Sequence, residues 1–218
     1  MEPEFWHNRW RNGQIGFHQP TVDSSLERLW PSLDLDKRHR VFVPLCGKSL
    51  DLLWLRDRGH FVVGVELSAT ALEAFCLENG VPARRRMRGE FDVYEAPGLE
   101  LYRGDFFALT PALLGDIAAV YDRAALISWT PELRGAYAEH LTSLIASGTQ
   151  VLLITLEYPQ AEMSGPPFSV TRDDLERLYS RSFDVREISR RDILANEARL
   201  RANGVTALSE VCYRLVRR

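Results

Sequence analysis

Short apolar runs rich in β-branched residues alternate with segments of helical periodicity through the middle of the chain. The apolar runs predict strands at residues 40–45, 61–65, 99–102, 117–122 and 150–156. Helical patterns run from Ser49 or Asp51 to Arg58-Gly59, from Ser68 to Asn79-Gly80, and over about 131–146. Strands that alternate with helices in this way are typical of a parallel sheet with helices on its faces. The pattern therefore predicts an α/β fold of the doubly wound kind.

The last third of the chain has a different order of elements. A helix is predicted over 171–179, a strand over 183–188, a helix over 191–202 and a strand over 208–216. Because no helix follows the last strand, we expect the sheet to end in antiparallel strands. A hairpin is expected around 91–94, and the arginine-rich run 84–88 before it is interpreted as a solvated loop rather than a phosphate-binding patch.

About 39 residues precede the first predicted strand, and they are rich in aromatic side chains. An amphipathic helix over 4–11 would lie across the carboxyl ends of the strands, where open α/β sheets bind ligands. The plainer interpretation is that the aromatic residues only fill the core. Without internal repeats or a low-complexity linker, residues 1–218 are predicted to form a single domain, with 1–39 as an N-terminal helical cover and 40–218 as the sheet and its helices.

Composition and charge narrow the class of protein. The chain is 45% apolar and 26% charged, as in globular proteins, and its net charge of −3 gives no reason to expect a nucleic-acid partner. No apolar run approaches the roughly 20 residues of a membrane span, and the first residues lack a signal-peptide pattern. Three cysteines without a CxxC spacing argue against a disulfide framework or a zinc site. We therefore expect a cytoplasmic protein without a metal or a membrane partner. We also expect it to be a monomer.

The turn after the first predicted strand contains a single glycine, Gly47. A dinucleotide fingerprint requires three glycines, and a Walker phosphate loop requires a glycine at position 42, which is phenylalanine. The turn is therefore not built for a pyrophosphate. Glu66 ends the next strand, 19 residues later, where an acid in such folds accepts hydrogen bonds from ribose hydroxyls. An equally good interpretation is that Glu66 is an acid at a helix N-terminus, where the helix dipole favours a negative charge. A nucleoside ligand without a pyrophosphate fits both features.

Other polar residues allow two interpretations each. The fourth predicted strand ends in Asp122-Arg123, which is interpreted either as a structural ion pair or as part of the site. In the site, Arg123 would orient an anion but could not act as a general base. His18 is the one histidine considered as a proton acceptor, the others being structural or at the surface. Cys46 is interpreted as a small buried filler rather than a nucleophile, since no histidine or carboxylate motif accompanies it.

Several segments, in order along nearly the whole chain, closely resemble the thiopurine S-methyltransferase family, especially its bacterial members. The matching segments are FWHNRW (5–10), IGFHQ (15–19), VFVPLCGK (41–48), WLRDRGH (54–60), VVGVELS (62–68), DRAAL (122–126) and GPPF (165–168). The resemblance implies a class I, Rossmann-like methyltransferase fold, a mostly parallel seven-stranded sheet with an N-terminal cover.

The resemblance also implies a cofactor and its contacts. The cofactor is S-adenosyl-L-methionine, which becomes S-adenosyl-L-homocysteine, with implied contacts at Trp10, Leu45, Glu66 and Arg123 and adenine-side contacts near Asp105-Phe106. Asp105 stands where some relatives have serine. Phe17 matches a position that lines the substrate cavity, and Arg199 matches an active-site arginine.

The activity implied is methylation of aromatic or heterocyclic thiols such as thiopurines, and the bacterial members are also linked to selenium and tellurium species. No obligatory catalytic base is expected, because an acidic thiol reacts as its anion; Arg123 and Arg199 are the candidates for orienting it. Two alternatives remain at this point. One is a nicotinamide-dependent oxidoreductase, which shares the sheet and the acid, and the other is a non-catalytic nucleoside-binding module.

Overall fold

A computed structural model describes residues 3–218, except for the side chain of Arg199. The chain forms two compact units, one that ends at Val120 and one from Tyr121 to Arg218. The single domain over 1–218 stays a prediction.

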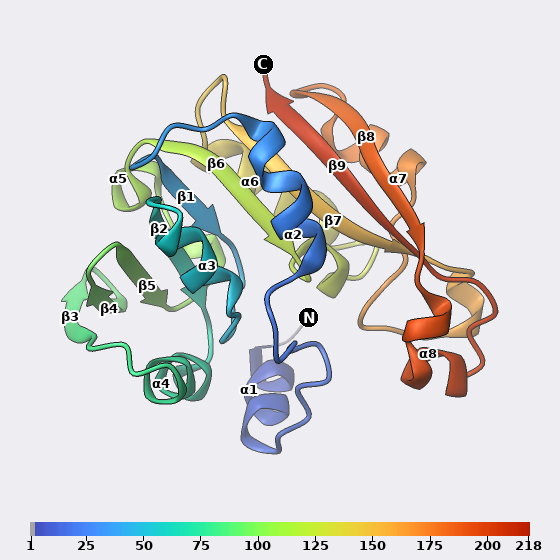
Figure 1. Ribbon diagram of the computed structural model, residues 1–218, viewed down its shortest axis with the longest axis horizontal. Coiled ribbons are helices and arrows are strands. Elements are labelled where there is room, and N and C mark those ends of the chain that lie inside the picture. Colours follow the sequence, from blue (N-terminus) through green and yellow to red (C-terminus); the bar gives the residue numbers. More distant parts are fainter. Residues whose placement is uncertain (1–2) are drawn as a thin grey trace. The chain divides into compact units, whose positions relative to one another are not determined.

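The unit that ends at Val120 contains a sheet with a parallel centre (Figure 1). Its strand order is β3-β4-β5-β2-β1-β6, in which β1 pairs in parallel with β2 and β6, and β2 pairs in parallel with β5. The strands are β1 (Arg40–Val43), β2 (Phe61–Glu66), β3 (Arg84–Arg88), β4 (Phe91–Ala96), β5 (Leu99–Arg103) and β6 (Ile117–Arg123), the last of which continues into the second unit. The helices are α1 (Pro3–Arg11), α2 (Ser24–Leu29), α3 (Asp51–Asp57), α4 (Ala69–Glu78) and α5 (Pro111–Leu114), with 3-10 turns η1 (Trp30–Leu33) and η2 (Phe106–Ala108).

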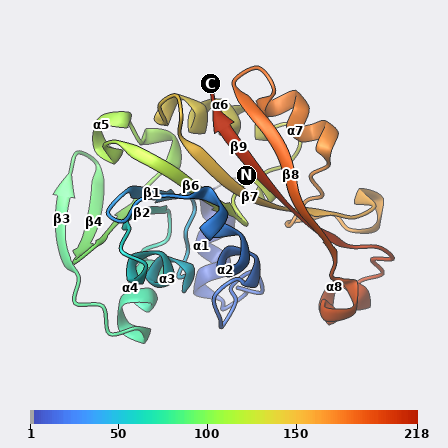
Figure 2. The ribbon, with the colours of Figure 1, turned by 45° about the horizontal axis from the view of Figure 1, so that its top comes forward.

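The unit from Tyr121 onward contains the antiparallel finish that the sequence predicts (Figure 2). Its strands β7 (Gln150–Glu157), β8 (Phe183–Asp192) and β9 (Ser209–Arg217) have the order β7-β9-β8, with both pairs antiparallel. The helices are α6 (Arg134–Leu144), α7 (Arg172–Tyr179) and α8 (Ala198–Ala202), with 3-10 turns η3 (Leu126–Ser128), η4 (Gln160–Glu162) and η5 (Leu194–Asn196).

The strand count exceeds the seven that the resemblance implies. Residues 3–218 contain nine strands, and the additional two are β3 and β4, which form an antiparallel hairpin beside β5. This hairpin includes the one expected around 91–94. The α/β class and the parallel centre are as predicted.

Local signals explain where the helices begin and end. The Ser68 hydroxyl accepts a hydrogen bond from the Ala71 N–H at 3.3 Å, which caps α4, and Gly80 follows the helix at a φ of 60°. Gly59 has the same role after α3, at a φ of 95°. Because these signals act within one turn of chain, the sequence predicts them well.

The prediction of a loop at 84–88 is wrong, since these residues form β3. Cross-strand ion pairs explain the difference, because the arginine side chains meet carboxylates of the neighbouring strands. Arg86 Nε lies 2.6 Å from Glu95, Arg88 contacts Glu100 at 2.8 Å, and Arg85 is paired with Asp92. The strand is largely exposed, as a solvated face should be.

The prediction of a helix over 191–202 is also wrong in its first half. Strand β8 continues to Asp192, past an irregularity between Glu187 and Ser189, and only 198–202 are α-helical. Ion pairs to β7 and β9 hold the extension: Arg190 contacts Glu157 of β7 at 2.6 Å, and Arg191 contacts Glu210 of β9 at 2.7 Å. These partners are distant in sequence, so the local helical pattern gave no sign of them.

The core of the first unit is made of β-branched and aromatic side chains on the central strands. Gly64 on β2 leaves space for its neighbours, because a Cβ there would lie 2.8 Å from both Cys46 Sγ and Leu101 Cδ2. Trp30, one of the aromatic residues before the sheet, is buried and donates a hydrogen bond from Nε1 to His60 Nε2 at 3.0 Å. It therefore lies beside the amino end of β2, so core filling is the right interpretation for this residue.

Within residues 3–218, none of the helices has both the length and the apolar character that a bilayer crossing requires. The three cysteines are free thiols.

Candidate functional site

The turn between β1 and α3 has an unusual backbone. Leu45 has a φ of 46° and Gly47 a φ of 54°, so two of three consecutive residues lie in the left-handed region. The conformation costs a residue with a side chain about 1–2 kcal/mol, and such strain collects at ligand sites. The Cys46 N–H, which donates to Val65 O at 2.9 Å, ties the turn to β2.

Glu66, at the end of β2, connects this turn to the start of α4. Its Oε2 accepts a hydrogen bond from the Gly47 N–H at 2.9 Å, and its Oε1 accepts one from the Ser68 N–H at 2.8 Å. A carboxylate offers about four acceptor positions, and backbone N–H groups on both sides of Glu66 occupy several of them, so this one acid fixes both turns. The interpretation as an acid at a helix N-terminus is supported, because Ser68, whose N–H donates to Glu66, is the N-cap residue of α4.

The charge state of Glu66 is set by opposing effects. Burial raises the pKa of this carboxyl above its usual value, and the N–H groups of Ser68, Gly47 and Leu67 partly offset the rise. The side chain is 6% exposed, so any further donor to it has to come from a ligand that enters the turn or from a neighbouring backbone group.

An aromatic cluster lies against the glycine turn. A Cβ on Gly47 would be 3.2 Å from Cζ2 of Trp10, so the indole packs directly on the bare backbone. Phe17 contacts Trp10 and Trp6 edge to face, with centroids 5.5 and 5.7 Å apart. The N-terminal segment therefore brings Trp10 and Phe17, two predicted site residues, to the turn that holds Glu66.

Substituting Gly47 with alanine tests this packing. Both Gly47→Ala and the control Gly80→Ala place alanine at positive φ, at a cost of about 1–2 kcal/mol, but a Cβ at Gly80 has nothing within 4 Å. We expect both variants to lose Tm because of the backbone strain that they share. Gly47→Ala should lose more, and it alone should change the tryptophan fluorescence. Identical spectra and Tm values for the two variants would contradict the contact with Trp10.

The segment after β5 joins the same group. The Gly104 N–H donates to the Glu66 carbonyl at 3.0 Å, which places Asp105-Phe106 beside the end of β2. The Asp105 carboxylate accepts from the Phe107 N–H at 2.9 Å and so caps η2. Phe106 is 2% exposed. The first unit thus brings together Trp10, Phe17, Leu45, Glu66 and Phe106.

The second unit begins with the other end of β6. Arg123 is the last residue of that strand, and Ala124 after it has a φ of 61°. Asp122 is fully buried and accepts hydrogen bonds from the Tyr137 hydroxyl at 2.7 Å and from the Leu126 N–H at 3.1 Å. Asp122 therefore shapes the loop that follows Arg123, a role for which the sequence gave only the Asp-Arg pair.

Arg199 belongs to α8 by its backbone, and its side chain lies outside the described part of the structure. Its predicted contact with substrate stays a prediction, as do the cofactor contacts of the other site residues.

Neither Cys46 nor the histidines form a nucleophile or a metal site among the described residues. Burial raises the pKa of the Cys46 thiol well above its usual value, and the sulfur packs where Gly64 lacks a side chain, as expected of a filler. His60 is held by Trp30, and burial lowers its pKa. The described residues contain no group of three or more His, Cys, Asp or Glu side chains that could hold a metal.

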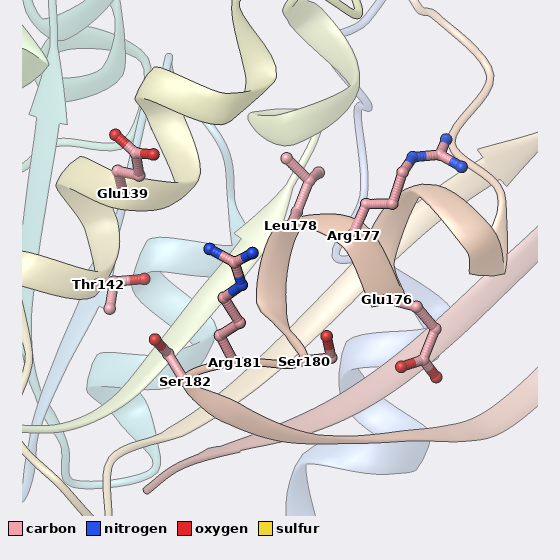
Figure 3. A pocket seen from close by; sticks show the side chains of 8 residues that line it. All are labelled: Glu139, Thr142, Glu176, Arg177, Leu178, Ser180, Arg181 and Ser182. Carbon is pink, nitrogen blue, oxygen red and sulfur yellow. The ribbon is translucent and has the colours of Figure 1, made fainter.

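A groove between α6 and α7 is lined by none of the predicted site residues (Figure 3). Its side chains include Glu139 and Glu176 as well as Arg177 and Arg181, so its charges favour neither an anion nor a cation. We assign it no part in the site.

Comparison with known proteins gives one consistent answer. The family model described as thiopurine S-methyltransferase matches residues 1–218. A thiopurine S-methyltransferase of Pseudomonas fluorescens is 48% identical over the full length of both chains, and one of Nitrosospira multiformis is 45% identical over 100% of this chain and 99% of the relative.

Solved structures agree on the fold. An S-adenosylmethionine-dependent methyltransferase of Anabaena variabilis superposes with a TM-score of 0.68 at 16% identity, over 99% of this chain and 95% of the other. A Burkholderia thailandensis 1,6-didemethyltoxoflavin N1-methyltransferase, solved with S-adenosylhomocysteine, gives a TM-score of 0.64 at 12% identity, over 99% and 86%. The class I methyltransferase fold is thereby confirmed.

Proposed function

Because the chain belongs to the thiopurine S-methyltransferase family, we propose that it transfers a methyl group from S-adenosylmethionine to the sulfur of aromatic or heterocyclic thiols, thiopurines among them. The observation that supports this most directly is the Glu66 carboxylate, which holds the glycine turn and the start of α4 at the carboxyl ends of the parallel strands β1 and β2, the edge at which such folds bind a nucleoside.

The residues of the first unit fit an adenosine ligand. A ribose presents two neighbouring hydroxyls, which match the two oxygens of Glu66, and the missing side chain at Gly47 lets a ligand approach the backbone. Trp10, Leu45 and Phe106 would supply apolar contacts, and Arg123 a charged one. This is the assignment that the family resemblance predicts.

When bound, S-adenosylmethionine supplies an electrophilic methyl on a sulfonium, which passes to the acceptor sulfur and leaves S-adenosylhomocysteine. The residues of this chain would exclude water and fix the line of attack, which lowers the barrier through orientation. Phe17 and Trp10 would cover the aromatic acceptor, while Arg123 and Arg199 would hold its anionic sulfur or ring nitrogen. An aryl thiol is acidic enough to lose its proton to solvent, so no residue has to act as a base.

The test is a methyl-transfer assay with labelled S-adenosylmethionine over thiopurines, aryl thiols, selenite and tellurite. We expect labelled methylthio product and S-adenosylhomocysteine in equal amounts, with aromatic thiols preferred. Binding of S-adenosylhomocysteine without any labelled product would instead identify a non-catalytic nucleoside-binding module. Consumption of reduced nicotinamide would identify an oxidoreductase.

We further propose that the chain methylates selenium and tellurium species, and that it is a monomer in the cytoplasm. Selenite and tellurite are included as acceptors because of the bacterial members of the family. A cytoplasmic location is proposed because the cysteines are free thiols, as in a reducing compartment. A monomer is proposed as well. Light scattering of the purified chain and fractionation of cells test these two statements.

A further inference from the structure

Two segments of the second unit, far apart in sequence, fold against each other. Residues 158–170 follow β7, and residues 193–208 connect β8 to β9. Tyr158, Val205 and Leu208 are buried together, and Met163, Ile193, Leu194 and Leu200 pack around them. These two segments are here called the double-loop cover. Leu200 lies in α8, so the position of that helix depends on this apolar cluster.

A paired hydrogen bond closes the double-loop cover at its surface. One oxygen of the Glu162 carboxylate accepts from the Thr206 N–H at 2.8 Å, and the other accepts from the Thr206 hydroxyl at 2.7 Å. These two bonds lower the pKa of Glu162, so the carboxylate is charged at neutral pH and the bonds are charge-assisted. Two hydrogen bonds therefore join Glu162 and Thr206, which are 44 residues apart in the sequence.

Backbone hydrogen bonds connect Thr206, one partner of this pair, to α8. Thr206 follows Val205, whose N–H donates to the Leu200 carbonyl at 3.2 Å, and the Gly204 N–H donates to Arg201 O at 3.0 Å. The chain from α8 to Thr206 is therefore short and internally bonded. Thr206 is thus connected through Val205 to Leu200, and so to the helix that contains residue 199.

The other half of the double-loop cover reaches the segment after β6. The Phe168 N–H donates to the Ile127 carbonyl at 2.8 Å, and the Tyr158 hydroxyl donates to Pro167 O at 2.6 Å. Residues 158–170 are thus bonded on one side to the loop that follows Arg123 and on the other, through Glu162, to the loop that follows α8. The carboxyl ends of strands are the edge at which such folds bind ligands.

We propose that Glu162 and Thr206 are positioning residues for the acceptor substrate, because their paired hydrogen bond fixes α8, and with it position 199, relative to the loop after β6. The inference rests on the proposed function, since it takes Arg199 as a contact of the acceptor. Neither residue touches substrate or cofactor; both act through the placement of α8.

The experiment compares Glu162→Ala, Thr206→Val and the conservative Thr206→Ser. We expect the first two to raise the KM for an aromatic thiol about tenfold, with the Kd of S-adenosylhomocysteine unchanged, and Thr206→Ser to keep the KM of the original chain. Hydrogen exchange over residues 194–204 should become faster in the first two variants only. Thr206→Val keeps the backbone donor, so it serves if Glu162→Ala does not fold.

Glu132→Gln is the matched control, because Glu132 also accepts a hydrogen bond from a threonine, Thr130, which lowers its pKa, but it belongs to neither segment of the double-loop cover. It should leave the acceptor KM unchanged. An unchanged KM in Glu162→Ala and Thr206→Val overturns the inference, as does a parallel loss of acceptor and cofactor affinity. Absence of methyl transfer by the unaltered chain overturns the proposed function as well, which is how the two failures are told apart.

Discussion

Replacing Glu66 with alanine is expected to weaken binding of S-adenosylhomocysteine by about 100-fold or more. A hydrogen bond to a charged group contributes about 1.5–3 kcal/mol, so losing two to the ribose corresponds to at least about 3 kcal/mol. The variant also leaves the N–H groups of Gly47 and Ser68 without their acceptor, and the glycine turn loses its link to α4. Isothermal calorimetry with S-adenosylhomocysteine measures the loss directly.

Two companions separate ribose recognition from damage to the fold. Glu66→Gln keeps the size of the side chain and one acceptor oxygen, so it should bind the cofactor more tightly than Glu66→Ala and less tightly than the original chain. Glu90→Gln alters an exposed acid in the turn between β3 and β4 and should change nothing. Equal affinity in Glu66→Ala and the original chain, with both folded, would refute the assignment of Glu66 to the ribose.

Replacing Asp122 with asparagine is expected to remove a fall in stability between about pH 4 and pH 6. Burial raises the pKa of Asp122 to about 6 from an ordinary value of 3.8. The folded chain therefore holds this proton more tightly than the unfolded chain. The stabilisation is complete below the unfolded pKa and is lost as the pH rises through the folded pKa, by about 3 kcal/mol at 1.36 kcal/mol for each pKa unit. Urea unfolding at closely spaced pH values measures the slope.

The asparagine can replace the hydrogen bonds with Leu126 and Tyr137. Its amide oxygen can accept from the Leu126 N–H, and its NH2 group can donate to the Tyr137 oxygen, so the variant should fold. A second variant, Tyr137→Phe, removes a donor that stabilises the carboxylate, and it should extend the fall in stability to higher pH. A pH dependence that is the same in the original chain and in Asp122→Asn would show that another group titrates in this range.

The elements that the sequence predicted best are those whose causes are local. The Ser68 cap, the glycines after α3 and α4, and the β-branched strands depend on a few neighbouring residues. The errors depend on distant partners. Arg190 and Arg191 extend β8 because acids on β7 and β9 face them, and the arginines at 84–88 form a strand because acids of β4 and β5 do so.

For the candidate site too, the sequence predicted the local features but not the contacts between distant segments. The glycine turn and Glu66 were found from their spacing, and the resemblance supplied the aromatic residues. The sequence could not give the left-handed Leu45, the contact of Trp10 with Gly47, or the use of both Glu66 oxygens by backbone donors. Each of these depends on how turns meet in space. The bond between Glu162 and Thr206 is a similar case, because a glutamate and a threonine 44 residues apart form no motif.

The arginines of β3 have a consequence for self-association. β3 is the first strand in the sheet order, so one side of its backbone has no partner strand within the sheet. Two copies pairing antiparallel about Arg86 would set Arg84 against Arg88, and Arg86 against its own counterpart. Like charges directly opposite destabilise a strand pair, and exposed edges blunted in this way resist polymerisation. We therefore expect the row of arginines on β3 to disfavour edge-to-edge association of two copies at this strand.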